Sequence, residues 1–189
     1  MITTLDRNTA LVLIDLQNMV VKMTAKQLIA PVIQNSAKLL AVFREAKLPV
    51  VIVNVNPVGS AASKTRKDAN RSSANGPLPD NALDIIPEIK TEQGDILITK
   101  ETWNAFYNTA LHTELQHKGI TGIILAGVAT SIGVEGTARS ANEYGYHIAF
   151  ASDAMTDLFL EAHAHSFKYI FPRLGEVGTT DEIIEKLGE

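Results

Sequence analysis

The sequence contains no cysteine. This absence excludes disulfide bonds, cysteine-ligated zinc and thiol nucleophiles together. Long hydrophobic runs are also missing: no stretch reaches about 18 uninterrupted apolar residues, the length that a membrane-spanning helix needs, and the first residues do not have the pattern of a signal peptide. We therefore expect a cytoplasmic protein that has no membrane partner.

An excess of positive charge is likewise absent. Seventeen basic and 21 acidic residues give a net charge of -4, so the chain has no electrostatic footprint for nucleic acid, and we expect no such partner. Three glycine motifs are missing as well. There is no G-x-G-x-x-G for a dinucleotide, no Gly-Lys-Ser/Thr for a P-loop and no G-x-S-x-G around a serine nucleophile. We expect no cofactor.

What is present is an alternation of apolar runs and helical patterns within 189 residues, which is enough for one domain over 1–189. The runs rich in β-branched residues predict buried strands at 10–15, 49–55, 95–100, 122–128 and 147–153. Helical spacing predicts helices at 29–48, 110–119, 133–145 and 158–171. Gly119 and Gly145 follow helical turns, as C-terminal glycines do. The pattern predicts an α/β fold with a mainly parallel sheet.

Ligands of parallel sheets bind beyond the carboxyl ends of the strands, so the residues at those ends are the candidates. Asp15 and Lys100 each end an apolar run and could form a coupled acid/base pair. The alternative is a carboxylate that caps a helix and a lysine that reaches solvent. The other strand-end candidates are Gln17, Asn18, Asn54, Asn56, Glu101, Trp103, Asn104, the turn 128–133 and Asp153.

The turn after the fourth strand offers backbone amides at a helix N-terminus, from Thr130 to Gly133, which would favour an anion. Close packing of helix on sheet, with Ser131 as the N-cap, explains the same pattern. Trp103 and Asn104 could wall a small-molecule pocket, although core packing or a subunit contact would also suit the tryptophan.

Basic residues and histidines supply weaker candidates. Arg66, Lys67 and Arg71 lie in a polar segment over 55–80 and could hold a substrate carboxylate; a solvated surface loop is the alternative. His163 and His165 point roughly 200° apart on a helix and cannot share a metal ion, so we expect no metal site there.

Taken together, ALVLIDLQN, ILITKETWNAFYNTAL, GVATSIGVEGTARSANEYGYHIAFASDAMTD and FPRLGEVGTTDEII resemble the isochorismatase-like hydrolases of the cysteine hydrolase superfamily over nearly the whole chain. The resemblance implies a three-layer αβα sandwich around a Rossmann-like sheet, and a homo-oligomer. By motif, the family's aspartate and lysine fall on Asp15 and Lys100, and Gly133 stands where most members have the nucleophilic cysteine. The family's cis peptide falls on Val128–Ala129.

Glycine at that position argues against the amidase chemistry of the family, because acyl transfer needs a nucleophile beside a base. The D-x-H motif of the zinc-binding members is also missing, and we expect no zinc. Isochorismatases are similar in having glycine there, and they cleave a vinyl ether. The resemblance therefore implies that Asp15 acts as a general acid on an isochorismate-like vinyl ether, with release of pyruvate, and that Lys100 tunes the acid or orients the substrate.

Two alternatives remain open. One is a small-molecule-binding paralogue that has lost catalysis, and the other is amide hydrolysis in which Ser131 or Thr130 replaces the cysteine. Under each reading the partner is a small molecule. The residues expected to bind it are Gln17, Arg66, Arg71, Trp103, Asn104, Val128, Ala129 and Thr130.

Overall fold

The computed structural model describes residues 1–66 and 78–188. Within them, a six-stranded sheet has the order β3-β2-β1-β4-β5-β6, and its paired strands are parallel. The central strands are buried on both faces, which is why their sequences are continuous apolar runs. The strands are β1 (Thr9–Ile14), β2 (Val50–Val55), β3 (Ile96–Lys100), β4 (Gly122–Val128), β5 (His147–Thr156) and β6 (Glu176–Gly178).

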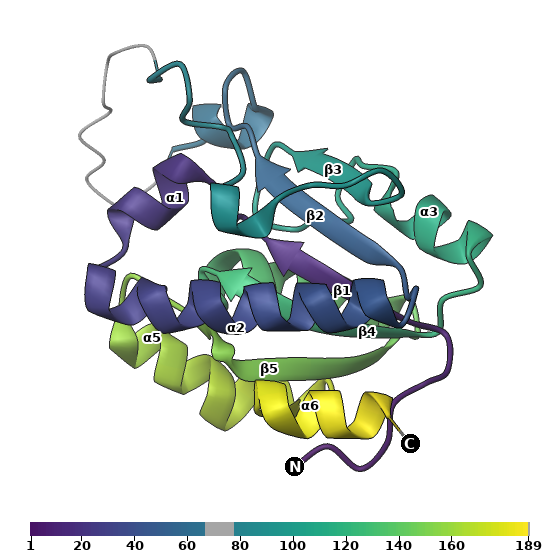
Figure 1. Cartoon of the computed structure of the whole chain (residues 1–189). Helices are drawn as coiled ribbons and strands as arrows, with labels where there is room; N and C mark the ends of the chain where they lie inside the picture. Colours follow the sequence, from purple (N-terminus) through teal and green to yellow (C-terminus); the bar gives the residue numbers. More distant parts are fainter. Residues whose placement is uncertain (67–77, 189) are drawn as a thin grey trace.

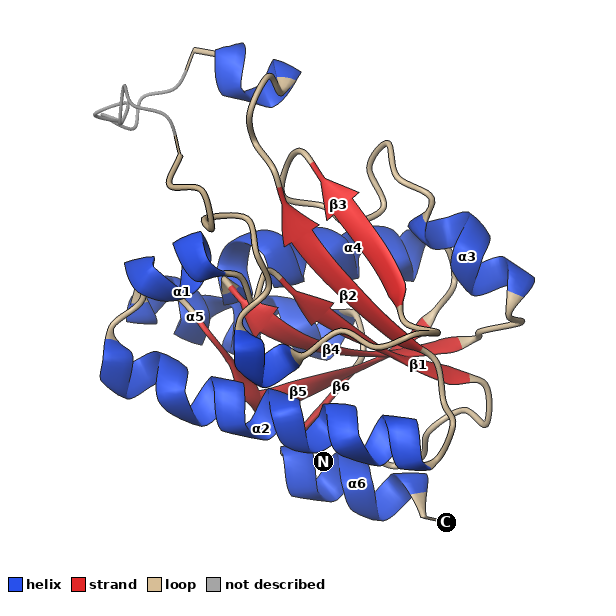
Figure 2. Ribbon diagram, turned by 45° about the horizontal axis from the view of Figure 1, so that its top comes forward, coloured by secondary structure: helices blue, strands red, loops and turns tan. Residues whose placement is uncertain are grey.

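Helices cover both faces of this sheet (Figures 1 and 2). On one face, α2 (Lys26–Glu45) and α6 (Thr180–Leu187) pack in a cluster that contains Phe43 and Ile183. On the other, α3 (Leu111–His117) and α4 (Glu135–Glu143) join a cluster that contains Leu115 and Ala138. The fold is therefore the expected three-layer α/β sandwich.

The remaining elements lie near the carboxyl ends of the strands or in the connections. Short helices α1 (Asn18–Met23) and α5 (Leu160–His165) follow β1 and β5. The 3-10 turns are η1 (Ala61–Lys64), η2 (Pro87–Ile89) and η5 (Phe171–Arg173), and the π-helical turns are η3 (Thr130–Val134) and η4 (Ser166–Ile170). None of the described helices combines the length and the apolar character needed to cross a bilayer.

Most predicted elements are confirmed with shifts of a few residues at their ends, and the left-handed glycines are confirmed at Gly119 (φ +65°) and Gly145 (φ +83°). The prediction that Asp153 ends the fifth strand is wrong. After an irregularity in its pairing with β4, β5 continues to Thr156, so Asp153 lies inside the strand, where it accepts hydrogen bonds from Thr180.

The helical predictions after β4 and β5 need two further corrections. The helix expected from 133 begins three residues earlier, as η3, and the residue at its N-cap is Ala129, so Ser131 lies inside the turn. The single helix expected over 158–171 is divided into α5, η4 and η5. η3 begins two residues after β4 ends, and its Gly133 lies against Ile14 at the end of β1.

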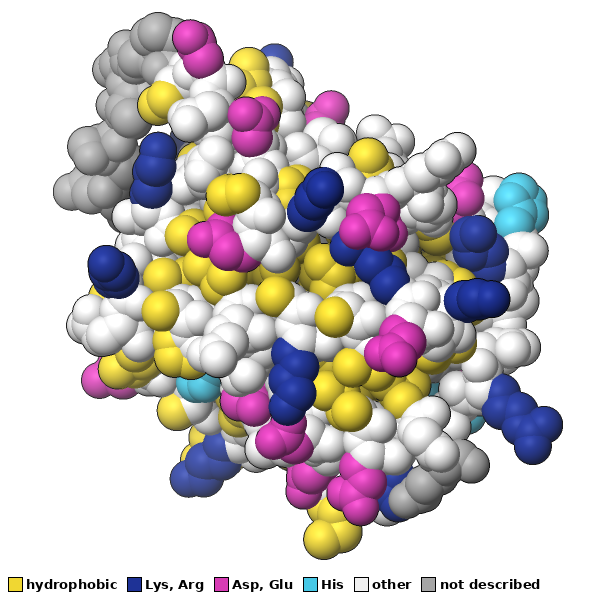
Figure 3. All heavy atoms as spheres, in the orientation of Figure 1, with side chains coloured by type: hydrophobic (Ala, Val, Ile, Leu, Met, Phe, Trp, Pro, Cys, Tyr) yellow, Lys and Arg dark blue, Asp and Glu magenta, His cyan; other side chains and the backbone are white. Residues whose placement is uncertain are grey.

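The strand order reverses between β1 and β4, and at such a switch point the connections leave in opposite directions and open a crevice. Gly127 allows the two strands to meet there. Its φ is +118°, and a Cβ on it would lie 2.1 Å from the carbonyl oxygen of Ile14. A side chain at this position would push β1 and β4 apart. On the face drawn in Figure 3, acidic and basic side chains are interspersed rather than gathered by sign.

Candidate active site

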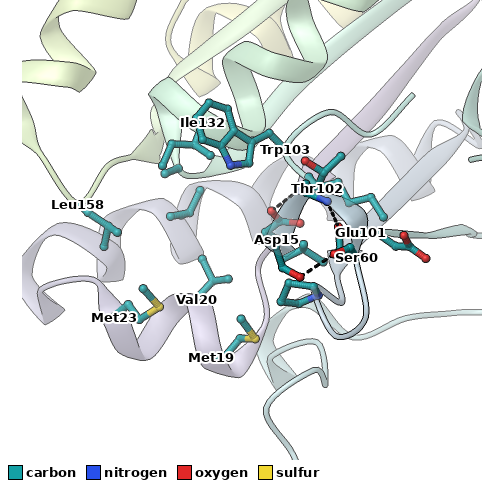
Figure 4. Close-up of a pocket in the computed structure, with 18 residues that line it drawn as sticks. Asp15, Met19, Val20, Met23, Ser60, Glu101, Thr102, Trp103, Ile132 and Leu158 are labelled. Carbon is teal, nitrogen blue, oxygen red and sulfur yellow. Dashed lines mark hydrogen bonds and ion pairs between the residues drawn. The ribbon is translucent and has the colours of Figure 1, made fainter. Parts of the chain in front are cut away.

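A cavity of about 250 Å³ opens at the carboxyl ends of β1, β3 and β4. Asp15, Lys100 and Gly133 form its floor, and the helix α1 forms one wall. Figure 4 shows Asp15 in the middle, with the α1 side chains on one side and the residues after β2 and β3 on the other. The cavity therefore lies at the switch point of the sheet, where the fold places ligands.

A buried ion pair occupies the floor. Lys100 Nζ lies 2.6 Å from Asp15 Oδ2 and donates a second hydrogen bond, 3.0 Å long, to the carbonyl oxygen of Thr102. Lys100 is 1% exposed and Asp15 is 5% exposed. Because β2 separates β1 from β3, the long lysine side chain is needed to reach across the end of that strand. The pair joins the first and third strands of the chain.

The environment of Asp15 changes its acidity. Burial raises the pKa of this carboxyl to about 6, and the attraction of Lys100 and its hydrogen bond oppose the rise without cancelling it. The second oxygen, Oδ1, is buried and has no hydrogen-bond partner among the described residues. Asp15 also has a φ of +52°, a left-handed conformation that aspartate tolerates better than most residues. A carboxyl that titrates near neutral pH in a cavity is suited to proton transfer.

Gly133 brings the backbone of η3 directly beside this carboxyl. An ideal Cβ on Gly133 would lie 3.2 Å from Asp15 Oδ2 and 2.9 Å from Ile14 Cγ2. A side chain at 133 would therefore have to displace Ile14 or Asp15, and its absence lets η3 pack closely against the end of β1. The turn that carries Gly133 follows the Val128–Ala129 peptide bond, which is cis, as the resemblance predicts.

Hydrogen bonds with a residue of α5 and with the residue directly after β5 hold the start of η3. Thr130 Oγ1 lies 2.8 Å from His163 Nδ1, and the amide of Ser131 donates to Asp157 Oδ2 over 2.7 Å. Asp157 is fully buried, and its other oxygen accepts from the amide of Phe159. Burial lowers the pKa of His163, opposed by the nearby Asp157. These contacts hold η3 in place, and they direct the Thr130 hydroxyl toward α5.

The structure brings eight of the candidate residues together around the cavity: Asp15, Lys100, Glu101, Trp103, Val128, Ala129, Ile132 and Gly133. Gln17, Asn104, Thr130 and Arg66 are not among the described residues that line it. Gln17 is buried and exchanges two hydrogen bonds with the backbone of Val55. Asn104 donates to Ser140 and accepts from the amide of Phe106. Arg66 is exposed, and Lys67 and Arg71 lie outside the described residues.

Most of the apolar wall is not among the residues predicted from the sequence. Met19, Val20 and Met23 come from α1, and Leu158 lies just before α5 begins; Ile132, from the predicted turn, completes the wall. They carry no chemical motif, and only the packing of α1 and α5 over the strand ends brings them to one place. The sequence gives little sign of α1, because the run NMVVKM has neither an acidic first turn nor a side-chain cap to mark the start of a helix.

Metal binding finds no support in the part of the chain that the structure describes, since it holds no cluster of three or more histidine or carboxylate ligands. His163 bonds to Thr130, and the ring of His165 packs near that of Tyr169. The two histidines thus make separate contacts.

Comparisons with known proteins agree with this architecture. A family model described as an isochorismatase domain matches residues 9–182. The uncharacterised isochorismatase family protein YwoC of Bacillus subtilis is 38% identical over 182 residues, which are 96% of this chain and 95% of YwoC. The protein YecD of Escherichia coli O157:H7, described in the same way, is 36% identical and shares 96% of this chain and 97% of its own.

Solved structures are similar over the same length. An isochorismatase family protein from Burkholderia thailandensis has a TM-score of 0.90 and 35% identity, with 98% of each chain covered. The N-carbamoylsarcosine amidase from Thermoplasma acidophilum has a TM-score of 0.75 and 26% identity, with 92% of this chain and 97% of its own covered. The chain thus shares its fold with proteins of the isochorismatase family and with an amidase.

Proposed function

The chain belongs to the isochorismatase family, and we propose that it is a hydrolase of this family that works by acid catalysis, without a covalent intermediate. The reaction we propose is cleavage of a vinyl ether or a similarly acid-labile bond in a small molecule. Asp15 would be the acid, Lys100 its positioning partner, and Gly133 would stand where a nucleophilic side chain stands in most of the family.

The observation that carries this proposal is the buried carboxyl of Asp15 on the cavity floor, with its pKa raised to about 6 beside a position without a side chain. A neutral carboxyl can donate a proton near the pH of a cell, which an ordinary aspartate cannot do to a useful extent. The cavity of about 250 Å³ that these residues line would hold the substrate and the water molecule.

The chemical steps balance with these groups alone. Asp15 gives its proton to the terminal carbon of the vinyl group, and the ether carbon becomes an oxocarbenium centre. A water molecule adds its oxygen to that carbon and returns a proton to the Asp15 carboxylate. The resulting hemiketal collapses to a ketone and an alcohol; from an isochorismate-like substrate the ketone would be pyruvate. Lys100 holds Oδ2 throughout, through its 2.6 Å contact.

Amide hydrolysis with a substitute nucleophile has less support. Thr130 is fully buried, and its hydroxyl contacts His163 rather than the cavity. Ser131 is partly exposed, but its backbone is held by Asp157, and neither residue is among the described lining of the cavity. A nucleophile must face the substrate beside its base.

A non-catalytic binding protein is the second candidate, because the ion pair of Asp15 with Lys100 would also exist in a site that only binds. The test compares wild-type protein with Asp15→Asn, and uses Asp181→Asn, an exposed aspartate on α6, as the matched control. Vinyl-ether substrates, isochorismate and an uncharged ether, are supplied at pH 5 to 8. A positioned acid contributes about 10²–10⁴-fold, so Asp15→Asn should lose that factor and Asp181→Asn should lose none.

The pH dependence has a definite sign. Asp15 must carry its proton, so kcat/KM should be constant below pH about 6 and fall about tenfold for each pH unit above it. Turnover that rises through this range, or that survives in Asp15→Asn, would rule out Asp15 as the acid. Binding without turnover in both proteins would favour the non-catalytic candidate.

A further inference from the structure

The charged groups of the cavity bear on which substrates it can hold. Three of the described lining residues are charged: Asp15, Lys100 and Glu101. Lys100 is already engaged, because its ammonium group bonds to Asp15 Oδ2 and to the carbonyl oxygen of Thr102. Glu101 is exposed at the mouth of the cavity, where Figure 4 shows it on the same side as Thr102 and Ser60.

These three charges never add to a positive total. With Asp15 ionised, one positive and two negative groups leave a net lining charge of -1. With Asp15 protonated, Lys100 and Glu101 balance to zero. A carboxylate that enters such a cavity loses its hydration without gaining a free counter-charge, which is unfavourable unless the charge is paired. Isochorismate would bring two carboxylates.

The side chains of the opposite wall are mostly apolar and favour an apolar part of a ligand. Met19, Val20 and Met23 on α1 face the cavity together with Leu158, and Trp103 and Ile132 lie beside them (Figure 4). Methionine side chains adapt to irregular apolar shapes, and an aromatic ring adds a large contact area. A volume of about 250 Å³ suits a molecule of roughly one ring with a short substituent.

We infer that the substrate of this site is a small uncharged molecule with a substantial apolar part, and that carboxylates, isochorismate included, are excluded by the charge of the lining. This inference rests on the proposed function for the bond that is cleaved, but not for the preference in binding. It is an alternative to the sequence-based expectation that Arg66 and Arg71 hold a substrate carboxylate.

The test uses two pairs of probes, and the members of each pair are nearly isosteric and differ in charge. 2-(Benzyloxy)acrylamide and 2-(benzyloxy)acrylate have nearly the same shape and the same vinyl ether, and both release benzyl alcohol on hydrolysis. Their saturated analogues, 2-(benzyloxy)propanamide and 2-(benzyloxy)propanoate, cannot undergo this hydrolysis and report binding alone. Calorimetric titration of the wild-type protein at pH 7 with the saturated pair measures the preference, and benzyl alcohol release from the vinyl pair measures turnover.

We expect the uncharged member of each pair to be favoured at least tenfold in Kd and in kcat/KM. Glu101→Gln should narrow this ratio several-fold, because it removes the negative charge at the mouth, whereas Arg66→Ala should leave the ratio unchanged. The inference would be overturned if the propanoate bound as tightly as the propanamide or more tightly. Loss of that propanoate binding in Arg66→Ala would show that Arg66 holds the carboxylate. Failure of both saturated probes to bind would also overturn the inference. Preferential binding of the propanamide without benzyl alcohol release would uphold the inference and contradict the proposed hydrolysis.

Discussion

The two ends of β1 each carry an aspartate paired with a basic side chain, and the pairs differ in almost every respect. At the carboxyl end, Asp15 and Lys100 have side chains only 7% and 2% exposed. At the amino end, Asp6 precedes the strand and lies 2.9 Å from His147 Nδ1, with side chains 21% and 80% exposed. One strand thus supports a pair away from water and a pair in contact with it.

The pKa values of the two aspartates follow from this difference in exposure. Burial would raise the pKa of Asp6 as well, but hydrogen bonds from Thr121 and His147 outweigh it and hold the pKa below its ordinary value. At Asp15 burial prevails over Lys100, and the pKa rises to about 6. A second cavity lies beside Asp6 and His147, so a cavity with a carboxylate is not enough to make an acid. The carboxyl must also be deprived of water.

The largest change in stability is expected from Lys100→Met, which removes the cation of the buried pair. Asp15 would then be buried without its cation, and its pKa would rise further. At pH 8 the folded state must hold an unpaired charge or take up a proton, so we expect the free energy of unfolding to fall by about 3–5 kcal/mol. At pH 5 Asp15 is already protonated in the native state, and the loss should be much smaller. Urea unfolding at both pH values measures this, and equal losses would show that Asp15 does not titrate in between.

A smaller effect is expected from Gly133→Ala. The new methyl group would meet Ile14 Cγ2 at 2.9 Å and Asp15 Oδ2 at 3.2 Å, and such overpacking typically destabilises by about 1–3 kcal/mol. It would also press on the Asp15 carboxyl and move it from its place beside Lys100, so turnover should fall.

Gly136→Ala is the matched control, since its methyl group would have Trp103 Cβ at 3.4 Å as its nearest neighbour. In the helix α4 this change should stabilise by about 0.5–1 kcal/mol. Thermal unfolding and kcat/KM of both variants provide the measurement. Unchanged turnover in Gly133→Ala would mean that the close packing of Gly133 against Asp15 has no part in the reaction.

The smallest effect is expected at the exposed pair. Because the pKa of Asp6 is lowered on folding, its contribution to stability is present above its unfolded value of 3.8 and is lost as the pH falls through the folded value. Asp6→Asn should therefore reduce stability at pH 7 by about 0.2–1 kcal/mol, and by less near pH 3. Salt should weaken the difference. A loss as large as that of Lys100→Met would show that burial does not set the difference between the two pairs.

Much of this arrangement could be predicted from local pattern. The apolar runs locate the first five strands because strands buried on both faces need continuous hydrophobic residues. The short strand β6 offers only three residues and no such run. The helix α6 is not among the predicted elements, although the sequence carries a signal for it: Thr179 and Glu182 form a capping box, a pair that marks the start of a helix.

The residues of the candidate site that lie at strand ends could be predicted from the sequence, whereas most of the apolar residues that form the cavity wall could not. Asp15 and Lys100 stand out because a charge ends an apolar run. Gln17 and Asn104 are polar residues that also follow strand ends in the sequence, yet their side chains bond to neighbouring backbone and to Ser140. Which polar side chain remains free for a ligand depends on hydrogen-bond partners distant in sequence.

By itself, the sequence determined the class of fold, the absence of a thiol nucleophile and the position of an acid, a lysine and a glycine at strand ends, because each of these is a property of residue type or local periodicity. Only the tertiary structure decided that Lys100 reaches Asp15 across β2, that Gly133 packs against the same carboxyl, and that α1 closes the cavity with apolar side chains. Strand order and loss of water arise from packing between distant segments, and from them follow the raised pKa of Asp15 and the uncharged substrate that we infer.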